Sequence, residues 1–569
     1  MRIRIGILLA LSSLFSFLGA QVVSITPANA TIDDSVTIVY DASQGNATLM
    51  GQMPVFAHCG VINKNSTDLG DWQHQKSQWD SGYDTTIVMT ALGNDLHQIA
   101  FVPRTYFGLS STEEVRAMAF VFRNETGTLA GKNADGSDIY VPVFPDSTFS
   151  ATLWAPLARP RILSLNDQMQ IEVRANAPSL ITIYQAGLPI AQSAGLVSQF
   201  NTNISANAYG KFSLSFTADD GSTVVADTTY YLVQPQTPIA ALPQGMRDGI
   251  NYVNDSTVVL VLLAPQKNFV YVIGDFNDWE MDPNYFMNRT SDGERYWLEI
   301  TGLQAGEEYG FQYFVDQYVK IGDPYSEKVL DEWNDNGVNN FVYPNLKPYP
   351  SGKTTELVTV LQTAKPSFNW QINNFQRPDN RDLVIYELLV RDFSIRHDYG
   401  TVIDSLDYLE KLGVNAIELL PVNEFDGNQS WGYGPAYYFA PDKYYGTETK
   451  LKEFIDECHS RGIAVILDVV FNHSFGQNPL MRLYQDRGTG KVSGNNPWFN
   501  IEAPHPLGLG FDFDHESVYT QMHFDSVLSF WAQEYRVDGF RLDLSKGFTN
   551  NNTGQNIGDW SMYDQGRVN

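Results

Sequence analysis

The hydrophobic and polar positions follow two different patterns along the chain. From residue 21 to about residue 350, apolar residues form short β-type runs, such as residues 35–40, 115–122 and 258–263, and Gly, Asn, Asp and Pro separate the runs. Pro-rich linkers divide this part into three blocks that each have the size of a β-sandwich: residues 21–144, 145–237 and 238–350. We therefore expect all-β domains over the first 350 residues.

After about residue 382 the pattern changes to strands that alternate with helices. Buried-type strands are expected at residues 383–390, 415–420, 463–470 and 539–544. Between them, residues 405–412 and 451–461 have helical spacing, and Gly413 and Gly462 are expected to end these helices. A repeated strand–helix–strand order predicts an α/β domain with a parallel sheet.

The N-terminus has the pattern of a secretory signal. Arg2 and Arg4 precede an apolar stretch at residues 5–18, and the small residues Gly19 and Ala20 follow it. Residues 1–20 are therefore interpreted as a signal peptide, and the protein is expected to be exported, to the periplasm or outside the cell. No other stretch reaches 18 apolar residues, so no membrane insertion is expected.

Composition excludes some partners and leaves others open. With 37 Lys and Arg against 65 Asp and Glu, the formal net charge is −28, which argues against nucleic acid and anionic lipid. Aromatic residues reach 13%, which suits the faces of sugar rings but also any β-rich protein. Cys59 and Cys458 lie in different predicted domains and are expected to be buried free thiols.

Polar side chains gather where the predicted parallel strands end. The third strand leads into residues 468–473 and the fourth into residues 541–546. Arg541 and Asp543 are two positions apart, so their side chains point to the same face of the strand. An arginine beside a carboxylate keeps it ionised, which suits a nucleophile. The alternative is a purely structural ion pair.

Together these segments carry a family resemblance. Residues 468–473 and 539–546, preceded by Trp-Gly-Tyr-Gly-Pro at 431–435, resemble glycoside hydrolase family 13, the α-amylase family. Residues 390–394 and 438–442 are similar to its pullulanase, isoamylase and branching-enzyme side. The resemblance implies a multidomain fold in which N-terminal all-β sandwiches precede an incomplete (β/α)8 TIM barrel, with about four strands present in residues 366–569.

The β blocks take their expected roles from the same comparison. Residues 274–279 resemble the carbohydrate-binding module family 48 sandwiches that precede many α-glucan enzymes, so residues 238–350 are expected to be such a domain. Residues 145–237 are expected to be Ig-like, and residues 21–144 are a candidate starch-binding sandwich. The tryptophans of these blocks have two possible roles, stacking on sugar at the surface or packing in the core. Core packing is favoured for Trp72, Trp79 and Trp279.

The resemblance also assigns roles to individual residues. Asp543 is the expected nucleophile that forms a covalent glycosyl-enzyme, and Arg541 orients it. His473 is expected to hydrogen-bond the sugar at the cleaved position, Tyr433 to stack on that sugar, and Asp468 to support the site from the same strand as His473.

Two further assignments concern specificity and metal. Lys546 is an expected substrate-binding residue, and the Gly547 that follows it departs from the Lys-His of amylases proper. Asn472 matches a position that ligates calcium in several family members, so a structural calcium is a candidate although no cofactor is required for the reaction. For the acidic loop at residues 512–514, a solvated surface is the favoured interpretation.

The expected function is a secreted retaining glycoside hydrolase that acts on α-glucans such as starch, glycogen or pullulan. The family's acid/base Glu follows a fifth strand, beyond residue 569, so we expect the chain to be an N-terminal fragment that is inactive alone. Glu424 is the only other acid considered, and the family does not support it. The alternative is a non-catalytic protein that binds α-glucan. The sequence leaves α-1,4 against α-1,6 specificity, and hydrolysis against transglycosylation, open.

Overall fold

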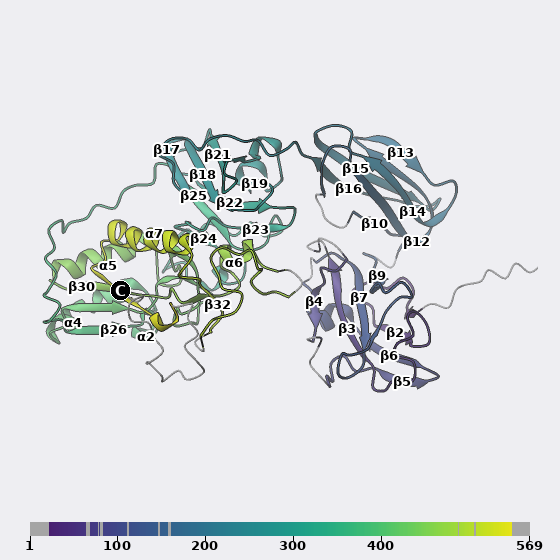
Figure 1. Cartoon of the computed structure of the whole chain (residues 1–569), viewed down its shortest axis with the longest axis horizontal. Helices are drawn as coiled ribbons and strands as arrows, with labels where there is room; N and C mark the ends of the chain where they lie inside the picture. Colours follow the sequence, from purple (N-terminus) through teal and green to yellow (C-terminus); the bar gives the residue numbers. More distant parts are fainter. Residues whose placement is uncertain are drawn as a thin grey trace, which may run out of the picture. The chain divides into compact units, whose positions relative to one another are not determined.

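Strands predominate in the computed structural model of the chain (Figure 1). It describes residues 22–63, 66, 69–77, 79, 83–110, 113–145, 148–156, 161–486, 489–505 and 508–548. The chain divides into two compact units, which we call unit 1 (residues 1–235) and unit 2 (residues 236–569). The expectation of a multidomain, mostly β protein is confirmed. The predicted signal peptide at residues 1–20 lies outside the described residues.

The first part of unit 1 consists of two antiparallel sheets. One has the order β1 (Val23–Thr26), β2 (Val36–Asp41), β6 (Leu96–Phe101), β5 (Thr90–Gly93). The other has the order β4 (Gln73–Lys76), β3 (Phe56–Asn63), β7 (Val115–Arg123), β8 (Ala130–Gly131), with β9 (Ile139–Pro142) also paired to β7; the short helix α1 is Pro103–Phe107. Side chains that alternate along β2, such as Ile38, meet Cys59 of β3 and Phe120 of β7 in one core. Cys59 is buried and free, and so is Cys458 of unit 2, as expected.

The second part of unit 1 is organised around one long strand. This strand is β12 (Gln168–Gln185), and the other strands are β10 (Ala151–Ala155), β11 (Arg161–Leu163), β13 (Leu188–Gln192), β14 (Val197–Ser205), β15 (Gly210–Asp219) and β16 (Val224–Val233). The first half of β12 pairs with β10 and β14 and its second half with β13 and β15, and its register with β14 shifts between Arg174 and Ser179. Apolar residues of these strands form a separate core.

Unit 2 begins with two further antiparallel sheets. The first has the order β17 (Gly249–Asn254), β18 (Thr257–Leu263), β21 (Arg295–Thr301), β20 (Asn288–Arg289). The second has the order β19 (Val270–Gly274), β22 (Glu308–Val315), β25 (Val358–Gln362), β24 (Val329–Leu330), with β23 (Val319–Ile321) paired to β22. β25 lies beyond the predicted boundary at residue 350. The sequence pattern did not indicate this strand, which comes back to the sheet after the loop around Pro350. Trp279 is buried and its Nε1 donates to Asp275 at 3.1 Å, so it belongs to the core.

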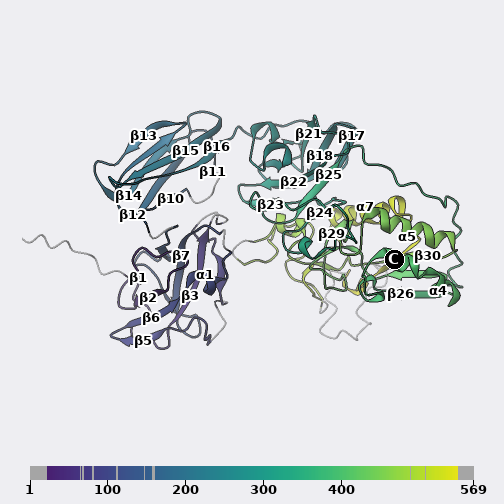
Figure 2. The same cartoon turned by 180° about the vertical axis from the view of Figure 1, so that it is seen from behind.

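A four-stranded parallel sheet, curled into a half-barrel, forms the rest of unit 2. Its order is β26 (Ile385–Leu388), β27 (Ala416–Leu419), β30 (Ala464–Val469), β33 (Gly539–Leu542). Its helices are α2 (Val390–Phe393), α3 (Tyr399–Asp404), α4 (Leu406–Lys411), α5 (Glu448–Ser460), α6 (Pro479–Leu483) and α7 (Val518–Glu534). Two antiparallel strand pairs accompany the parallel sheet: β28 (Asn423–Phe425) with β29 (Pro435–Pro441), and β31 (His473–Ser474) with β32 (Phe511–Asp512). The two long helices α5 and α7 lie side by side in both views (Figures 1 and 2), and a salt bridge from Lys452 to Glu534 joins them.

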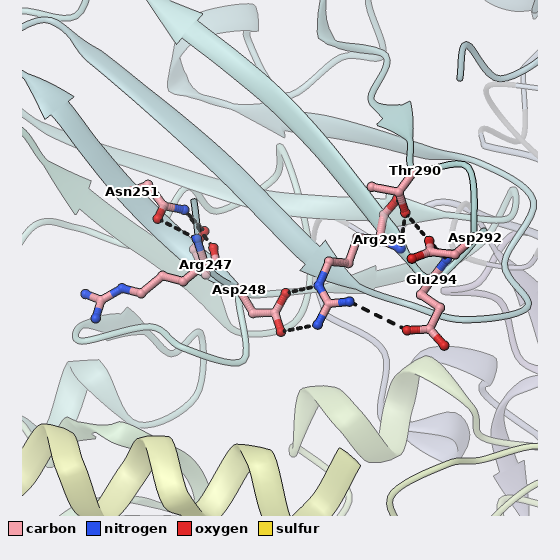
Figure 3. Close-up of polar contacts among 8 residues, drawn as sticks. Arg247, Asp248, Asn251, Thr290, Asp292, Glu294 and Arg295 are labelled. Atoms are coloured by element: carbon pink, nitrogen blue, oxygen red, sulfur yellow. Dashed lines mark hydrogen bonds and ion pairs between the residues drawn. The ribbon is translucent and has the colours of Figure 1, made fainter. Parts of the chain in front are cut away.

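The two parts of unit 2 share one hydrophobic core and a chain of polar contacts. The guanidinium of Arg295, on β21, donates to both carboxylate oxygens of Asp248, at 2.7 and 3.1 Å (Figure 3). Its Nη1 atom lies 3.6 Å from Oε2 of Glu294. Glu294 in turn accepts a hydrogen bond of 2.9 Å from the hydroxyl of Tyr519 on α7. This chain of contacts ties the sheet of β21 to the helices of the half-barrel. Among the described residues, no helix combines the length and the apolar character that crossing a membrane requires.

Candidate active site

Arg541 links two carboxylates at the carboxyl end of the parallel sheet. Its Nη1 atom donates to Oδ1 of Asp543 at 2.7 Å and to both carboxylate oxygens of Asp468 at 3.0 Å. The register explains the meeting, because Asp468 of β30 lies opposite Arg541 of β33. Burial alone would lower the pKa of Arg541, but the hydrogen bonds and charges of the two carboxylates raise it above its usual range. Arg541 therefore stays charged beside Asp543.

Asp468 is a buried acceptor rather than a free acid. It is 1% exposed, and burial raises its pKa. The Tyr433 hydroxyl, which donates to its Oδ2 at 2.7 Å, and Arg541 both counter that rise, because they favour the ionised carboxylate. The sequence predicted Tyr433 as a stacking residue and missed this hydroxyl contact. Gly432 allows it: with φ at 91°, a Cβ there would lie 2.4 Å from the carbonyl oxygen of Pro421.

His473 is held by backbone and amide groups next to Tyr433. Its Nε2 atom lies 3.0 Å from the carbonyl oxygen of Tyr433, and its Nδ1 lies 3.2 Å from the side-chain nitrogen of Asn472. Since an amide nitrogen donates, Nδ1 accepts and Nε2–H donates, which is the neutral tautomer. Burial lowers the pKa of His473, which agrees with a neutral ring. Lys546 lies nearby in the chain, in the turn Ser545–Gly547 that follows Asp543.

Two carboxylates that the sequence interpretation passed over lie in register on the neighbouring strands. Glu387 of β26 pairs with Glu418 of β27. Burial and the charges of Asp468 and Glu387 raise the pKa of Glu418, while Arg541 lowers it. Glu387 and Glu418 occupy the same position on two neighbouring strands of the predicted parallel sheet, and this pattern could have identified them from the sequence. Glu424, the alternative acid, is buried and bound to Lys443, which does not suit proton transfer to a substrate.

Asn472 lies where several oxygen atoms gather, which allows its assignment to calcium to be tested. Its Oδ1 atom is buried and has no hydrogen-bond partner among the described residues. His505 fills the neighbouring space, with its Nε2 2.8 Å from the carbonyl oxygen of Gly547 and 3.1 Å from Oδ1 of Asp512. Asp512 is buried, so the expectation of a solvated loop was wrong at this residue.

The donor set around Asn472 does not fit calcium in this arrangement. Calcium takes six to eight oxygen ligands, and here an imidazole nitrogen already engages two of the oxygen atoms. Burial lowers the pKa of His505, but its contacts with Asp512 raise it overall, so the ring can supply positive charge itself. We therefore derive no catalytic step from calcium.

Metal removal tests this arrangement directly. If His505 occupies the position of the cation, neither calcium chloride nor EDTA shifts the melting temperature of the protein by more than about 1 °C, because a ligand stabilises only a state that binds it. The measurement is a thermal melt by circular dichroism, with magnesium chloride as the matched salt control. A clear rise with calcium alone would show that Asn472 and Asp512 do bind the ion.

Comparisons with known proteins match two segments of the chain. Residues 373–508 match the family model "Alpha amylase, catalytic domain", and residues 23–130 match a domain of unknown function. The resemblance to the α-amylase family is thereby confirmed over residues 373–508, which match its catalytic-domain model.

Two curated relatives and one solved structure are similar to parts of the chain. The malto-oligosyltrehalose trehalohydrolase of Saccharolobus solfataricus is 30% identical over 269 residues, 47% of this chain and 41% of the relative. A 1,4-alpha-glucan branching enzyme of Halothermothrix orenii is 30% identical, over 52% of this chain and 45% of the relative. The chain thus spans less than half the length of these relatives. The solved structure of a Paenibacillus barengoltzii pullulanase with maltohexaose and alpha-cyclodextrin aligns at 22% identity with a TM-score of 0.42, over 53% of this chain and 49% of the other.

Proposed function

We propose that the protein is an exported, α-glucan-active retaining glycoside hydrolase with Asp543 as its nucleophile. The single observation that carries the proposal is the contact of Arg541 with both Asp543 and Asp468, on adjacent parallel strands. The family match at residues 373–508 supports the substrate class. The pattern of residues 1–20 supports export.

In the proposed reaction, a carboxylate oxygen of Asp543 attacks the anomeric carbon while the bond from that carbon to the leaving oxygen breaks. A general acid gives the leaving oxygen its proton. Water then attacks the same carbon, the bond to Asp543 breaks, and the proton of the water returns to the acid group. Arg541 and Asp468 hold the carboxylate in place, and His473 and Tyr433 shape the position of the sugar. An activated fluorosugar is the test: mass spectrometry should locate the trapped glycosyl group on the peptide that contains Asp543.

The acid/base group of the proposed reaction is not assigned to any of the described residues. Retaining enzymes place their two carboxyl groups about 5–5.5 Å apart. Asp468 shares the guanidinium of Arg541 with Asp543, but its oxygens already accept from Arg541 and Tyr433. We therefore propose that the acid/base Glu implied by the family resemblance is supplied from outside residues 22–548.

This proposal makes a prediction about the 569-residue chain. Tested by itself, the chain is expected to release no reducing ends from starch, pullulan or glycogen above a no-enzyme blank, because none of its described residues is assigned as the proton donor to the leaving oxygen. The full gene product, assayed under the same conditions, is the positive control. Turnover by the 569-residue chain would show that one of its own acids serves the reaction. The same observation favours, as a second candidate, a protein that only binds α-glucan, and inactivity of the full gene product would support that candidate.

A further inference from the structure

A pocket of about 510 Å³ opens beside the β28–β29 hairpin of unit 2, and neither the proposed reaction nor the family resemblance uses it. One wall follows β24, at residues 334–337, and the other is the hairpin loop at residues 426–430. The lining residues are Asn334, Gly337, Asp426, Gly427, Asn428, Gln429, Ser430 and Tyr444. Six of these eight residues carry an amide, carboxyl or hydroxyl group, so the pocket can bind a ligand rich in hydroxyl groups.

Specific contacts hold the two walls together. The Asn428 side-chain nitrogen donates to the carbonyl oxygen of Asn334 at 2.8 Å. A Cβ at Gly337 would lie 2.7 Å from that same nitrogen, so glycine is needed for the amide to keep its place. Lys443, next to the lining residue Tyr444, forms salt bridges with Glu424 and, at 3.2 Å, with Asp335 of the first wall. The pocket is therefore built by packed segments, which favours a preformed site.

One wall carries an acceptor that has no partner. Oδ1 of Asp426 is buried and makes no hydrogen bond to the described residues. Burial and the nearby charge of Asp331 raise the pKa of Asp426 to about 6. An unpaired buried oxygen costs about 1–3 kcal/mol, so a bound hydroxyl group that donates to Asp426 would remove this cost.

Each wall leads directly into an exposed tryptophan. Trp333 precedes Asn334 and is 55% exposed, and Trp431 follows Ser430 and is 60% exposed. Tryptophan is usually well buried, and its flat apolar face with an N–H at one edge suits contact with a sugar ring. Trp431 also lies two residues before Tyr433, whose hydroxyl contacts Asp468, so one loop carries both the pocket and the active-site tyrosine.

We infer that this pocket is a second α-glucan site, which binds glucosyl units of the chain through the Trp333 and Trp431 rings and the polar lining. The inference rests on the proposed function for its substrate class. It adds that the β-sheet segment before the half-barrel contributes to glucan binding through Trp333 and Asn334. Since Trp431 and the active-site Tyr433 belong to one loop, we expect a long glucan bound there to extend toward the active site.

Calorimetric titration of the full chain with maltoheptaose tests the inference. All variants carry Asp543→Asn so that the sugar is not cleaved. Trp333→Ala is expected to weaken binding at least fivefold, whereas Tyr318→Ala, an exposed aromatic on the turn after β22, is expected to leave it unchanged. A thermal melt of each variant checks folding, which an exposed site tolerates well. Equal dissociation constants for the Trp333 and Tyr318 variants would overturn the inference.

A third variant separates this inference from the proposed function. His473→Ala removes a side chain of the predicted active site and leaves the pocket lining intact. Binding that depends on His473 but not on Trp333 would overturn the pocket and keep the proposed active site. Binding that depends on Trp333 but not on His473 would keep the pocket and count against the proposed active site. Absence of maltoheptaose binding to the Asp543→Asn chain would overturn the pocket, and turnover by the full gene product would then still support the hydrolase.

Discussion

Replacing Asp543 with Asn is expected to lower turnover of α-glucan by the full gene product at least ~10⁴-fold, the scale of loss seen when a catalytic nucleophile is removed. A neutral amide does not attack the anomeric carbon to form the covalent intermediate. Arg541 keeps its contact with Asp468 in the variant, and Asn has nearly the same size as Asp, so folding should be preserved. Reducing ends released from starch, pullulan and glycogen measure the effect, and the preferred polymer indicates the type of bond.

The matched control is Asp525→Asn, which makes the same chemical change on an exposed position of α7. It should retain the activity of the parent protein. Retention of more than about one hundredth of the parent activity by Asp543→Asn would contradict the assignment of the nucleophile, because no covalent step could then depend on this carboxylate.

Replacing Lys443 with Ala is expected to destabilise the protein by about 3–5 kcal/mol. Lys443 is 3% exposed and forms salt bridges with Glu424 and, at 3.2 Å, with Asp335. Without its ammonium group, two carboxylates that lie close together would be buried with no opposite charge. Urea unfolding monitored by tryptophan fluorescence measures the loss.

The sign of the pH dependence follows from the same contacts. Burial raises the pKa of Glu424 and of Asp335, and Lys443 lowers both. In the variant the folded-state pKa values rise further above the unfolded ones, so the folded state holds protons that the unfolded state releases. The stability of the variant then falls as the pH rises through the raised pKa values of Glu424 and Asp335. Its loss of stability relative to the parent should therefore be larger at pH 8 than at pH 5.

Lys353→Ala is the control for this substitution. Lys353 pairs with Asp278 at 2.5 Å on the surface, with its side chain 54% exposed, and surface pairs contribute about 0–1 kcal/mol. A loss at Lys443 no larger than that at Lys353, or one independent of pH, would show that the buried carboxylates find other partners in the variant.

Much of the site follows from local sequence pattern. Arg541 and Asp543 face the same way because side chains alternate along a strand, and that period is set within two residues. The strands around residues 464–469 and 539–542 were expected close to their observed bounds, because apolar runs between turn residues specify them locally. Gly413 and Gly462 end their helical segments with positive φ, as predicted, because glycine adopts that conformation without strain.

Other features exist only once distant segments meet. The sequence by itself determined which residues form the strands, which of them share a face, and which family residues 373–508 resemble. The tertiary structure decided that Arg541 also donates to Asp468, and that the Tyr433 hydroxyl donates to the same carboxylate. It also decided that His505 contacts the carbonyl oxygen of Gly547, close to Asn472. It also brought residue 334 to residue 428 to make the second pocket. The physical reason is the sequence distance over which each property is set. The alternation of side chains along a strand depends only on neighbouring residues, whereas the contact partners of a side chain depend on the register and closure of strands that are tens of residues apart.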